Sequence, residues 1–370
     1  MHALIASPFL DDYLVLKPDS QQAVKIGARK FDELLTTSAD PEARCPEWLT
    51  DAARKRWDLD IVGRHLAEAV KVRTPSSYGY GRASYELNLG CNYDCEHCYL
   101  GQKKFEGLGW RDREALLHTM RDAGVLWLQL TGGEPTIDKL FPQVYNAAWD
   151  LGMMITISTN GSRLHSSQMF ALLTERRPYR ITVSVYGATA EAYDGLTRTR
   201  GSFKAFTTGL AAAHEIGLPI HLNLVITKHN AHELDAMKAF AEGLGVTYNV
   251  YSNISPTIHG GAETLPSQSP EFLRERKPFT GCGAGHTHFH TDPHGMASIC
   301  KVGRDPQVSL VEHGVEGLRT LAEVADSLML RTGGCSGCAL SGTCWTCRPL
   351  AKLYQEAKSP LDRYCQHGGR

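Results

Sequence analysis

The stretch Tyr85-Glu-Leu-Asn-Leu-Gly-Cys91-Asn-Tyr-Asp-Cys95-Glu-His-Cys98 joins a short strand-like segment to three closely spaced cysteines. Five more strand-like segments follow it, and amphipathic, helix-like segments lie between them. Strands that alternate with helices predict a parallel sheet with right-handed crossovers. The six predicted strands cover residues 85–89, 126–130, 154–159, 180–186, 220–226 and 246–253.

Successive side chains of a strand point to opposite faces, so each predicted strand carries two sets of side chains. One set is apolar, as Leu128 and Leu130 illustrate, and the other is polar, as Ser158 and Asn160 illustrate. A closed eight-stranded barrel is filled mainly by branched apolar side chains. The polar set therefore predicts an α/β fold with a partial (β/α)6 TIM-like barrel that holds a polar ligand. The alternative is an open sheet with one solvated face, although parallel sheets usually have both faces covered.

The sequence on either side of the predicted barrel differs from it in composition and periodicity, which suggests two further domains. The first of them contains two predicted strands and three predicted helical segments, at residues 13–17, 23–26, 28–35, 47–57 and 61–70. Residues 74–81 have the composition of a linker. From about residue 279 onward Gly, His and Cys dominate, so we expect bound metal to contribute to folding there. The predicted domains are residues 1–75, 76–278 and 279–370.

The composition excludes several classes of protein. The chain has 370 residues, of which 42% are hydrophobic and 21% charged, as in a folded protein of two or three domains. Its net charge of −1 supplies no long-range field that would attract nucleic acid. No apolar run is long enough to span a bilayer, and the N-terminal stretch lacks a basic segment and contains Asp11 and Asp12. We therefore expect a soluble, cytoplasmic protein with no nucleic-acid or membrane partner.

Eleven cysteines are present, and all but Cys45 are grouped. In a chain of this size without an export signal, such grouping indicates metal ligation or redox chemistry rather than disulfides. The cysteines of residues 91–98 follow the first predicted strand, where the loops of a parallel barrel carry its active site. Three thiolates in one loop can hold three irons of a 4Fe–4S cluster and leave the fourth iron without a protein ligand. A bound zinc ion is the alternative.

With CxxxCxxC in the first βα loop and Gly132-Gly133-Glu134-Pro135 after the second strand, the sequence resembles the radical S-adenosylmethionine (radical SAM) enzymes. In that family the open iron of a 4Fe–4S cluster binds S-adenosylmethionine. One electron then cleaves a C–S bond and yields a 5'-deoxyadenosyl radical, which abstracts hydrogen from a substrate. The resemblance implies that Cys91, Cys95 and Cys98 hold such a cluster and that the chain is a radical SAM oxidoreductase.

The resemblance also implies which residues contact S-adenosylmethionine. The Gly-Gly-Glu motif would bind its amino group, polar strand ends would contact its carboxylate and ribose, an arginine would bind its carboxylate, and the ring before the third cysteine would face adenine. These positions are Gly132, Gly133, Glu134, Ser158, Asn160, Ser184, Arg198 and His97, with Tyr99 beside the third cysteine. Arg200 is an alternative to Arg198. No catalytic acid or base is assigned.

The C-terminal cysteines resemble those of a SPASM domain, which carries two auxiliary 4Fe–4S clusters. The resemblance implies that auxiliary cluster I is held by Cys282, Cys300 and Cys347. It implies that auxiliary cluster II is held by Cys335, Cys338, Cys344 and Cys365. The spacing before Cys347 is one residue shorter than is usual in this domain. The choice between cluster I and cluster II for Cys347 therefore stays open. Cluster I lacks a fourth cysteine, and the candidates for its fourth ligand are His286, His288 and His290. The alternative is that these histidines are polar strand residues or contact the substrate.

Residues 1–75 resemble the small winged-helix element that recognises leader peptides by adding the peptide to a sheet edge. An extension that only packs on the barrel is the alternative. We therefore predict oxidative modification, such as crosslinking or desaturation, of a ribosomally made precursor peptide, with a flavodoxin or ferredoxin as electron donor. The auxiliary clusters would accept an electron from the substrate. The alternatives are a radical SAM dehydrogenase or rearrangement enzyme for a small molecule, and a non-enzymatic zinc or iron–sulfur binding module.

Overall fold

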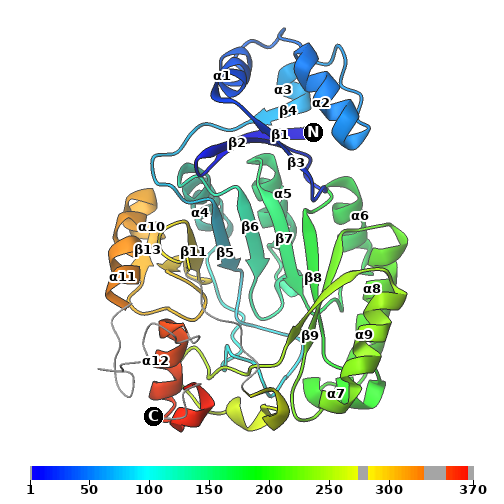
Figure 1. The fold of residues 1–370 in the computed structure, drawn as a ribbon, viewed down its shortest axis with the longest axis vertical. Coiled ribbons are helices and arrows are strands. Elements are labelled where there is room, and N and C mark those ends of the chain that lie inside the picture. Colours follow the sequence, from blue (N-terminus) through cyan, green and yellow to red (C-terminus); the bar gives the residue numbers. More distant parts are fainter. Residues whose placement is uncertain (1, 274–281, 329–346, 366–370) are drawn as a thin grey trace.

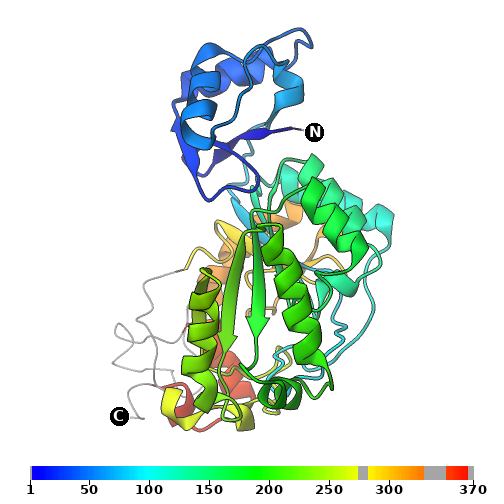
Figure 2. The same ribbon diagram turned by 90° about the vertical axis from the view of Figure 1, so that its right-hand side faces the viewer.

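The computed structural model describes residues 2–273, 282–328 and 347–365. A small N-terminal domain lies at one end of a larger α/β domain, and the view turned by 90° shows it as a separate layer (Figures 1 and 2). The small domain contains a four-stranded sheet in the order β3-β2-β1-β4. Its elements are β1 (Leu4–Phe9), β2 (Asp12–Leu16), β3 (Ala23–Ile26), α1 (Ala28–Thr37), α2 (Glu47–Trp57), α3 (Leu66–Ala69) and β4 (Val70–Val72).

The small domain has its own apolar core. The side chains of Phe31 and Leu34 on α1, Leu49 on α2 and Leu66 on α3 are fully buried there. Strand β1 was not predicted from the sequence, and the helix predicted over residues 61–70 was wrong because only Leu66–Ala69 is helical. The next three residues instead pair in parallel with β1, so tertiary pairing outweighs the local helical pattern.

The larger domain is built on a nine-stranded sheet in the order β10-β9-β8-β7-β6-β5-β11-β12-β13. Its first six strands are all parallel and follow one another in sequence order, as predicted. These strands are β5 (Arg82–Glu86), β6 (Trp127–Thr131), β7 (Met154–Thr159), β8 (Arg180–Val185), β9 (Ile220–Val225) and β10 (Thr247–Tyr251). The helices between them are α4 (Trp110–Asp122), α5 (Phe141–Asp150), α6 (Ser167–Glu175), α7 (Ala190–Thr197), α8 (Ser202–Glu215) and α9 (Leu234–Gly243).

Alternation along the strands separates an apolar layer from a polar one. Leu128, Ile157, Val183 and Leu222 are fully buried in one core that also contains side chains of the flanking helices, such as Phe206 of α8. Burying one such side chain contributes roughly 1.5–3 kcal/mol, so this layer fixes the helices to the sheet. The polar members of each strand point the other way, into the interior of the partial barrel.

The segment after residue 281 extends the same sheet. Strand β11 (His288–Thr291) pairs in parallel with β5, and the chain returns through the antiparallel strands β12 (Met296–Ser298) and β13 (Val308–Ser309). The structure therefore places the beginning of the predicted C-terminal domain against the first strand of the barrel. The remaining helices are α10 (Leu310–His313), α11 (Leu321–Leu328) and α12 (Arg348–Glu356). In the described ranges, no helix is both long and apolar enough to cross a membrane.

The small domain docks on the amino-terminal ends of the barrel strands. Ile5 and Leu16 share a buried cluster with Leu126 and Met154, which stand at the start of β6 and β7. The side-chain amide of Gln21 donates to the carbonyl oxygen of Tyr179 at 2.8 Å. Apolar burial and specific hydrogen bonds therefore hold the two domains together.

His2 contributes to this junction in a way that depends on pH. Its ring stacks on Trp149 of α5 at 3.9 Å between centroids, and its buried Nε2 has no hydrogen-bond partner among the described residues. Burial, assisted by the charge of Lys71, lowers the pKa of His2 to about 4. A free histidine titrates near pH 6.5, so between these values the unfolded chain binds more protons. The contribution of neutral His2 to folding stability is therefore complete above about pH 6.5 and is lost as the pH falls toward 4.

We expect His2→Phe, which keeps a stacked ring but cannot be protonated, to make stability less dependent on pH. Between pH 6.5 and 4 the melting temperature should fall less in this variant than in the unaltered protein. His313→Gln, at an exposed histidine, serves as the matched control and should leave the dependence unchanged. Thermal unfolding followed by circular dichroism at several pH values measures this effect. An identical fall in all three proteins would contradict the prediction.

Candidate functional site

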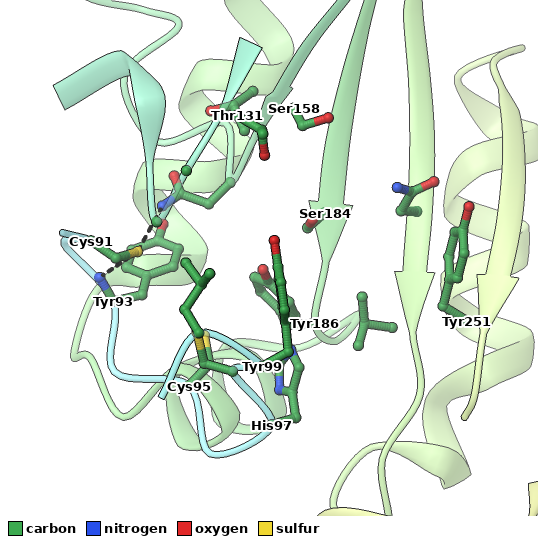
Figure 3. A pocket seen from close by; sticks show the side chains of 18 of the residues that line it. Cys91, Tyr93, Cys95, His97, Tyr99, Thr131, Ser158, Ser184, Tyr186 and Tyr251 are labelled. Atoms are coloured by element: carbon green, nitrogen blue, oxygen red, sulfur yellow. Dashed lines mark hydrogen bonds between the residues drawn. The ribbon is translucent and has the colours of Figure 1, made fainter. Parts of the chain in front are cut away.

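A cavity of about 430 Å³ opens at the carboxyl ends of the barrel strands (Figure 3). One wall is the loop after β5, with the thiols of Cys91, Cys95 and Cys98. The other walls are polar residues at the ends of the remaining strands, as the alternation in the sequence predicts. They include Gln129, Thr131, Ser158, Asn160, Ser184, Tyr186, Asn223 and Tyr251. The fold therefore brings three sulfur ligands and a set of hydrogen-bonding groups to one place.

Backbone and side-chain hydrogen bonds fix the cysteine loop in position. The Asp94 backbone N–H donates to the Thr197 carbonyl at 2.8 Å, and the Tyr93 hydroxyl donates to the Ser202 carbonyl at 3.2 Å. From the opposite side, the Asn160 amide donates to the side-chain oxygen of Asn92 at 2.9 Å. These contacts tie the loop to both α7–α8 and β7, so the three thiols stay directed into the cavity.

The three thiols form a donor set that suits a cationic group. Burial raises the pKa of Cys91 to about 11 and also raises the pKa values of Cys95 and Cys98. Bound iron reverses this effect because it stabilises thiolates directly. Over the described ranges, no three His, Cys, Asp or Glu side chains form a group that could hold a single metal ion. Separated thiols around one cavity suit a cluster in which each iron takes one sulfur.

The glycines of the second motif bring backbone atoms to the wall of the cavity. Gly132 has φ +147°, and a Cβ there would lie 2.4 Å from the Asn88 carbonyl oxygen. A Cβ on Gly133 would lie 2.1 Å from the carbonyl oxygen of Gly90. Both glycines line the cavity. Because side chains cannot fit, this loop packs directly on residues 88–90, which lead from β5 to Cys91.

Glu134 has a different place from its two neighbours. Its carboxylate is fully buried and accepts hydrogen bonds from the backbone N–H of Asn160 at 2.6 Å, the Thr159 hydroxyl at 2.7 Å and the Thr136 backbone N–H at 3.0 Å. Burial raises its pKa. Glu134 does not line the cavity. Its side chain joins the loop after β6 to the end of β7 and thereby positions Asn160.

The remaining residues expected to contact S-adenosylmethionine fall into two groups. Ser158, Ser184, His97 and Tyr99 line the cavity, and the His97 ring lies 5.3 Å from that of Tyr186. Burial lowers the pKa of His97 to about 4, so this ring is neutral at pH 7. Arg198 caps the C-terminus of α7 in a left-handed conformation, forms an ion pair with Glu96 at 3.3 Å and does not line the cavity.

A buried charge network beside the cavity was not predicted from the sequence. The Glu86 carboxylate on β5 accepts two hydrogen bonds from the Arg304 guanidinium, at 2.7 and 2.8 Å, and one from the Tyr99 hydroxyl at 3.2 Å. Burial opposes its charged form, but His290 and Arg304 hold the pKa of Glu86 well below its usual range. Lys301, which lines the cavity, lies nearby, and burial lowers its pKa to about 8.

The C-terminal cysteines are only partly described. Cys300 is half-buried, and burial, with a smaller electrostatic contribution from Cys282, raises its pKa. Cys347 precedes α12 and Cys365 follows Tyr364. The other three expected ligands, Cys335, Cys338 and Cys344, lie outside the described residues.

Two of the three candidate histidines have partners in the protein. His290 is fully buried, and its Nδ1 lies 2.8 Å from the Ser84 hydroxyl. The Nε2 of His286 lies 3.0 Å from the Asp326 carboxylate. His288 is half-buried at the start of β11, where burial and the nearby Arg82 lower its pKa.

Comparison with known proteins agrees with the geometry of the cavity. Residues 85–241, which begin in β5 and end in α9, match the model of the radical SAM superfamily. The chain carries a radical SAM domain. Its cysteine loop, its glycine motif and the polar ends of β6 to β9 belong to the matched residues, whereas Tyr251 of β10 follows them.

Two curated relatives show the range of proteins that share this domain. The AdoMet-dependent heme synthase of Methanosarcina barkeri is 26% identical over 181 residues, covering 48% of this chain and 51% of that protein. The mycofactocin maturase MftC of Mycobacterium ulcerans is 28% identical over 237 residues, covering 60% of this chain and 63% of that protein. The chain therefore spans about half to somewhat under two thirds of the length of these relatives.

The match to solved structures extends beyond the radical SAM domain. The crystal structure of Streptococcus suis SuiB bound to its precursor peptide SuiA has a TM-score of 0.63 at 14% identity, with 98% of each chain covered. At this identity the match concerns the fold. Together with the parallel strand order, it confirms the predicted partial TIM-like barrel.

We expect Glu134→Gln to destabilise the radical SAM domain. The amide keeps the shape of the side chain but places an NH₂ group opposite a hydrogen-bond donor, such as the backbone N–H of Asn160. The free energy of unfolding should fall by about 1–3 kcal/mol. Denaturant unfolding of the metal-free protein measures the loss. Glu106→Gln, at a half-exposed carboxylate, is the control, and equal stability of both variants would refute the expected role of Glu134.

Proposed function

We propose that the chain is a cytoplasmic radical SAM oxidoreductase that modifies a ribosomally made precursor peptide. The observation that carries this proposal is the single cavity lined by three thiols, two glycines and polar strand ends within a radical SAM domain. When bound there, a 4Fe–4S cluster and S-adenosylmethionine supply an electron and a 5'-deoxyadenosyl radical for hydrogen abstraction. A flavodoxin or ferredoxin would be the electron donor.

The residues of the cavity divide between these two groups. Cys91, Cys95 and Cys98 would hold the cluster. The backbone of the glycine loop, Ser158, Asn160 and Ser184 would bind and orient S-adenosylmethionine, and the neutral ring of His97 would face its adenine. Glu134 would act through Asn160, and Arg198 would keep its ion pair with Glu96. The apolar layer behind the strands excludes water from the outer side of the site.

Two auxiliary clusters complete the proposal. Cys282 acts electrostatically on Cys300, and the residue after Cys300 lines the cavity. A cluster at these cysteines and Cys347 would lie next to a bound substrate and could accept its electron. The second cluster would use Cys335, Cys338, Cys344 and Cys365. Iron analysis after anaerobic reconstitution tests this, because three clusters require about twelve irons per chain and bound zinc would contradict it.

A peptide substrate is supported by two observations. The fold matches, over nearly its whole length, a protein crystallised with a precursor peptide, and a relative is named as a maturase. The heme synthase relative favours the alternative of a small-molecule substrate. Co-expression with a short peptide encoded beside this gene distinguishes the two. A mass change of that peptide that depends on the enzyme supports the proposal, and an unmodified peptide that does not bind the enzyme contradicts it.

We expect Cys95→Ala to abolish reductive cleavage of S-adenosylmethionine, because two thiols are too few to hold an open-iron cluster in the cavity. The measurement is the yield of 5'-deoxyadenosine from reconstituted protein reduced with dithionite. Cys45→Ala is the matched control, because this cysteine is buried in the core of the small domain, and it should keep the normal yield. Residual 5'-deoxyadenosine from Cys95→Ala at the control level would overturn the radical SAM assignment.

The recognition role proposed for the small domain predicts an effect at strand β3, which forms one edge of its sheet. Neighbouring residues of an edge strand direct their N–H groups alternately toward the sheet and away from it. Of Val24→Pro and Lys25→Pro, one therefore removes an outward N–H and leaves the pairing with β2 intact. That variant should stay folded but bind the precursor about tenfold more weakly, because an intermolecular hydrogen bond is lost. Calorimetric titration measures binding, and unchanged affinity in both variants would exclude strand addition at β3.

A further inference from the structure

Lys301 is a cation of the cavity whose ammonium group has no partner among the described residues. Of the described residues, two lysines and no aspartate or glutamate line the cavity. The ammonium of Lys103 pairs with Asp94 and also donates to the Tyr93 carbonyl at 2.6 Å. The ammonium group of Lys301 makes no hydrogen bond or ion pair with any residue in the described part of the chain. Glu86 acts on its charge electrostatically, but both oxygens of that carboxylate accept hydrogen bonds from Arg304.

The position of Lys301 is built into the fold. The Nε of Arg304 donates to the Lys301 carbonyl oxygen at 2.8 Å, while the two terminal nitrogens of the same guanidinium bind Glu86. Glu86 is fully buried on β5, so it anchors Arg304, and Arg304 in turn fixes the backbone of Lys301. A half-buried charge without a partner is unfavourable, and an anion that enters the cavity relieves this cost.

The location of Lys301 separates this anion from S-adenosylmethionine. The strand residues expected to contact S-adenosylmethionine lie on or directly after β6, β7 and β8. Lys301 instead adjoins Glu86 on β5 and follows Cys300, one of the proposed ligands of auxiliary cluster I. A group bound at Lys301 would therefore lie between the cysteine loop of residues 91–98 and that cluster, where the proposed function requires the substrate.

We propose that Lys301 forms a carboxylate-binding subsite for the substrate, held in place by Glu86 and Arg304. A lysine ammonium supplies three donors to such a group, and charge-assisted hydrogen bonds are about twice as strong as neutral ones. The carboxylate belongs to an acidic side chain of the peptide or to its C-terminus. The identity of the ligand as a peptide rests on the proposed function, whereas the subsite rests on the charge and geometry of the cavity.

The test measures binding alone, so it needs neither the natural substrate nor a catalytic turnover. The probes are three capped tripeptides: acetyl-Gly-Glu-Gly-amide, acetyl-Gly-Gln-Gly-amide and acetyl-Gly-Gln-Gly with a free C-terminus. Their affinities for the reconstituted protein are measured by saturation-transfer NMR with S-adenosylmethionine present. At least one carboxylate probe should bind about tenfold more tightly than the amide probe, and the stronger one identifies the source of the carboxylate.

Substitutions at position 301 connect this preference to the lysine. Lys301→Gln should remove the preference and keep the iron content and the affinity for S-adenosylmethionine, whereas Lys301→Arg should retain the preference. Lys238→Gln, at an exposed lysine of α9, controls for loss of one positive charge and should bind the probes normally. The proposal is overturned if the unaltered protein shows no preference, if Lys301→Gln keeps it, or if Lys301→Gln loses affinity for S-adenosylmethionine instead. A failure of the proposed function would appear separately, as an absence of 5'-deoxyadenosine in the unaltered protein.

Discussion

The buried carboxylate of Glu86 connects the parts of this protein that must meet around one cavity. It stands on the first strand of the barrel and accepts hydrogen bonds from Tyr99, which follows the cysteine loop, and from Arg304, which follows Cys300. The Nε2 atom of His290, on strand β11, lies 3.4 Å from an oxygen of the Glu86 carboxylate. The Glu86 side chain therefore joins the cysteine loop to the segment expected to hold an auxiliary cluster. The placement of this segment relative to the loop depends on Glu86.

Such a network is costly unless it is complete. A buried ion pair gains little over an apolar pair of the same shape, but removing one partner leaves an unpaired charge and costs about 3–5 kcal/mol. The two terminal nitrogens of the planar Arg304 guanidinium donate to the two oxygens of Glu86. A lysine has no such planar pair of donors and could not fix the same orientation. The contribution of this site to the structure is therefore that it specifies a position rather than that it adds stability. That position is the backbone of residues 300–304, which carries both Cys300 and Lys301.

The barrel and its polar interior could be predicted from the sequence because they follow from short-range periodicity. Alternation alone places Ser158 and Ser184 in the cavity, and both line it. Periodicity does not report long-range pairing, so it missed the contact between Glu86 and Arg304, which are 218 residues apart. It also missed β4, whose residues form a strand only because β1 is beside them. The direction of the Glu134 side chain depends on donors contributed by Thr159 and Asn160, which no motif encodes.

The two ends of the barrel strands have different roles in this arrangement. The small domain docks at the amino-terminal ends, near Leu126 and Met154, whereas the cavity opens at the carboxyl ends (Figures 1 and 3). Strand β7 has six residues, so these ends are separated by about 20 Å, a distance that takes roughly six residues of extended peptide to span. If the small domain holds a precursor peptide, as proposed, that peptide is recognised well away from the residue that reacts. Under the proposed function, selection of the reacting residue would then depend on the cavity itself, where that residue would meet Lys301 and the polar strand ends.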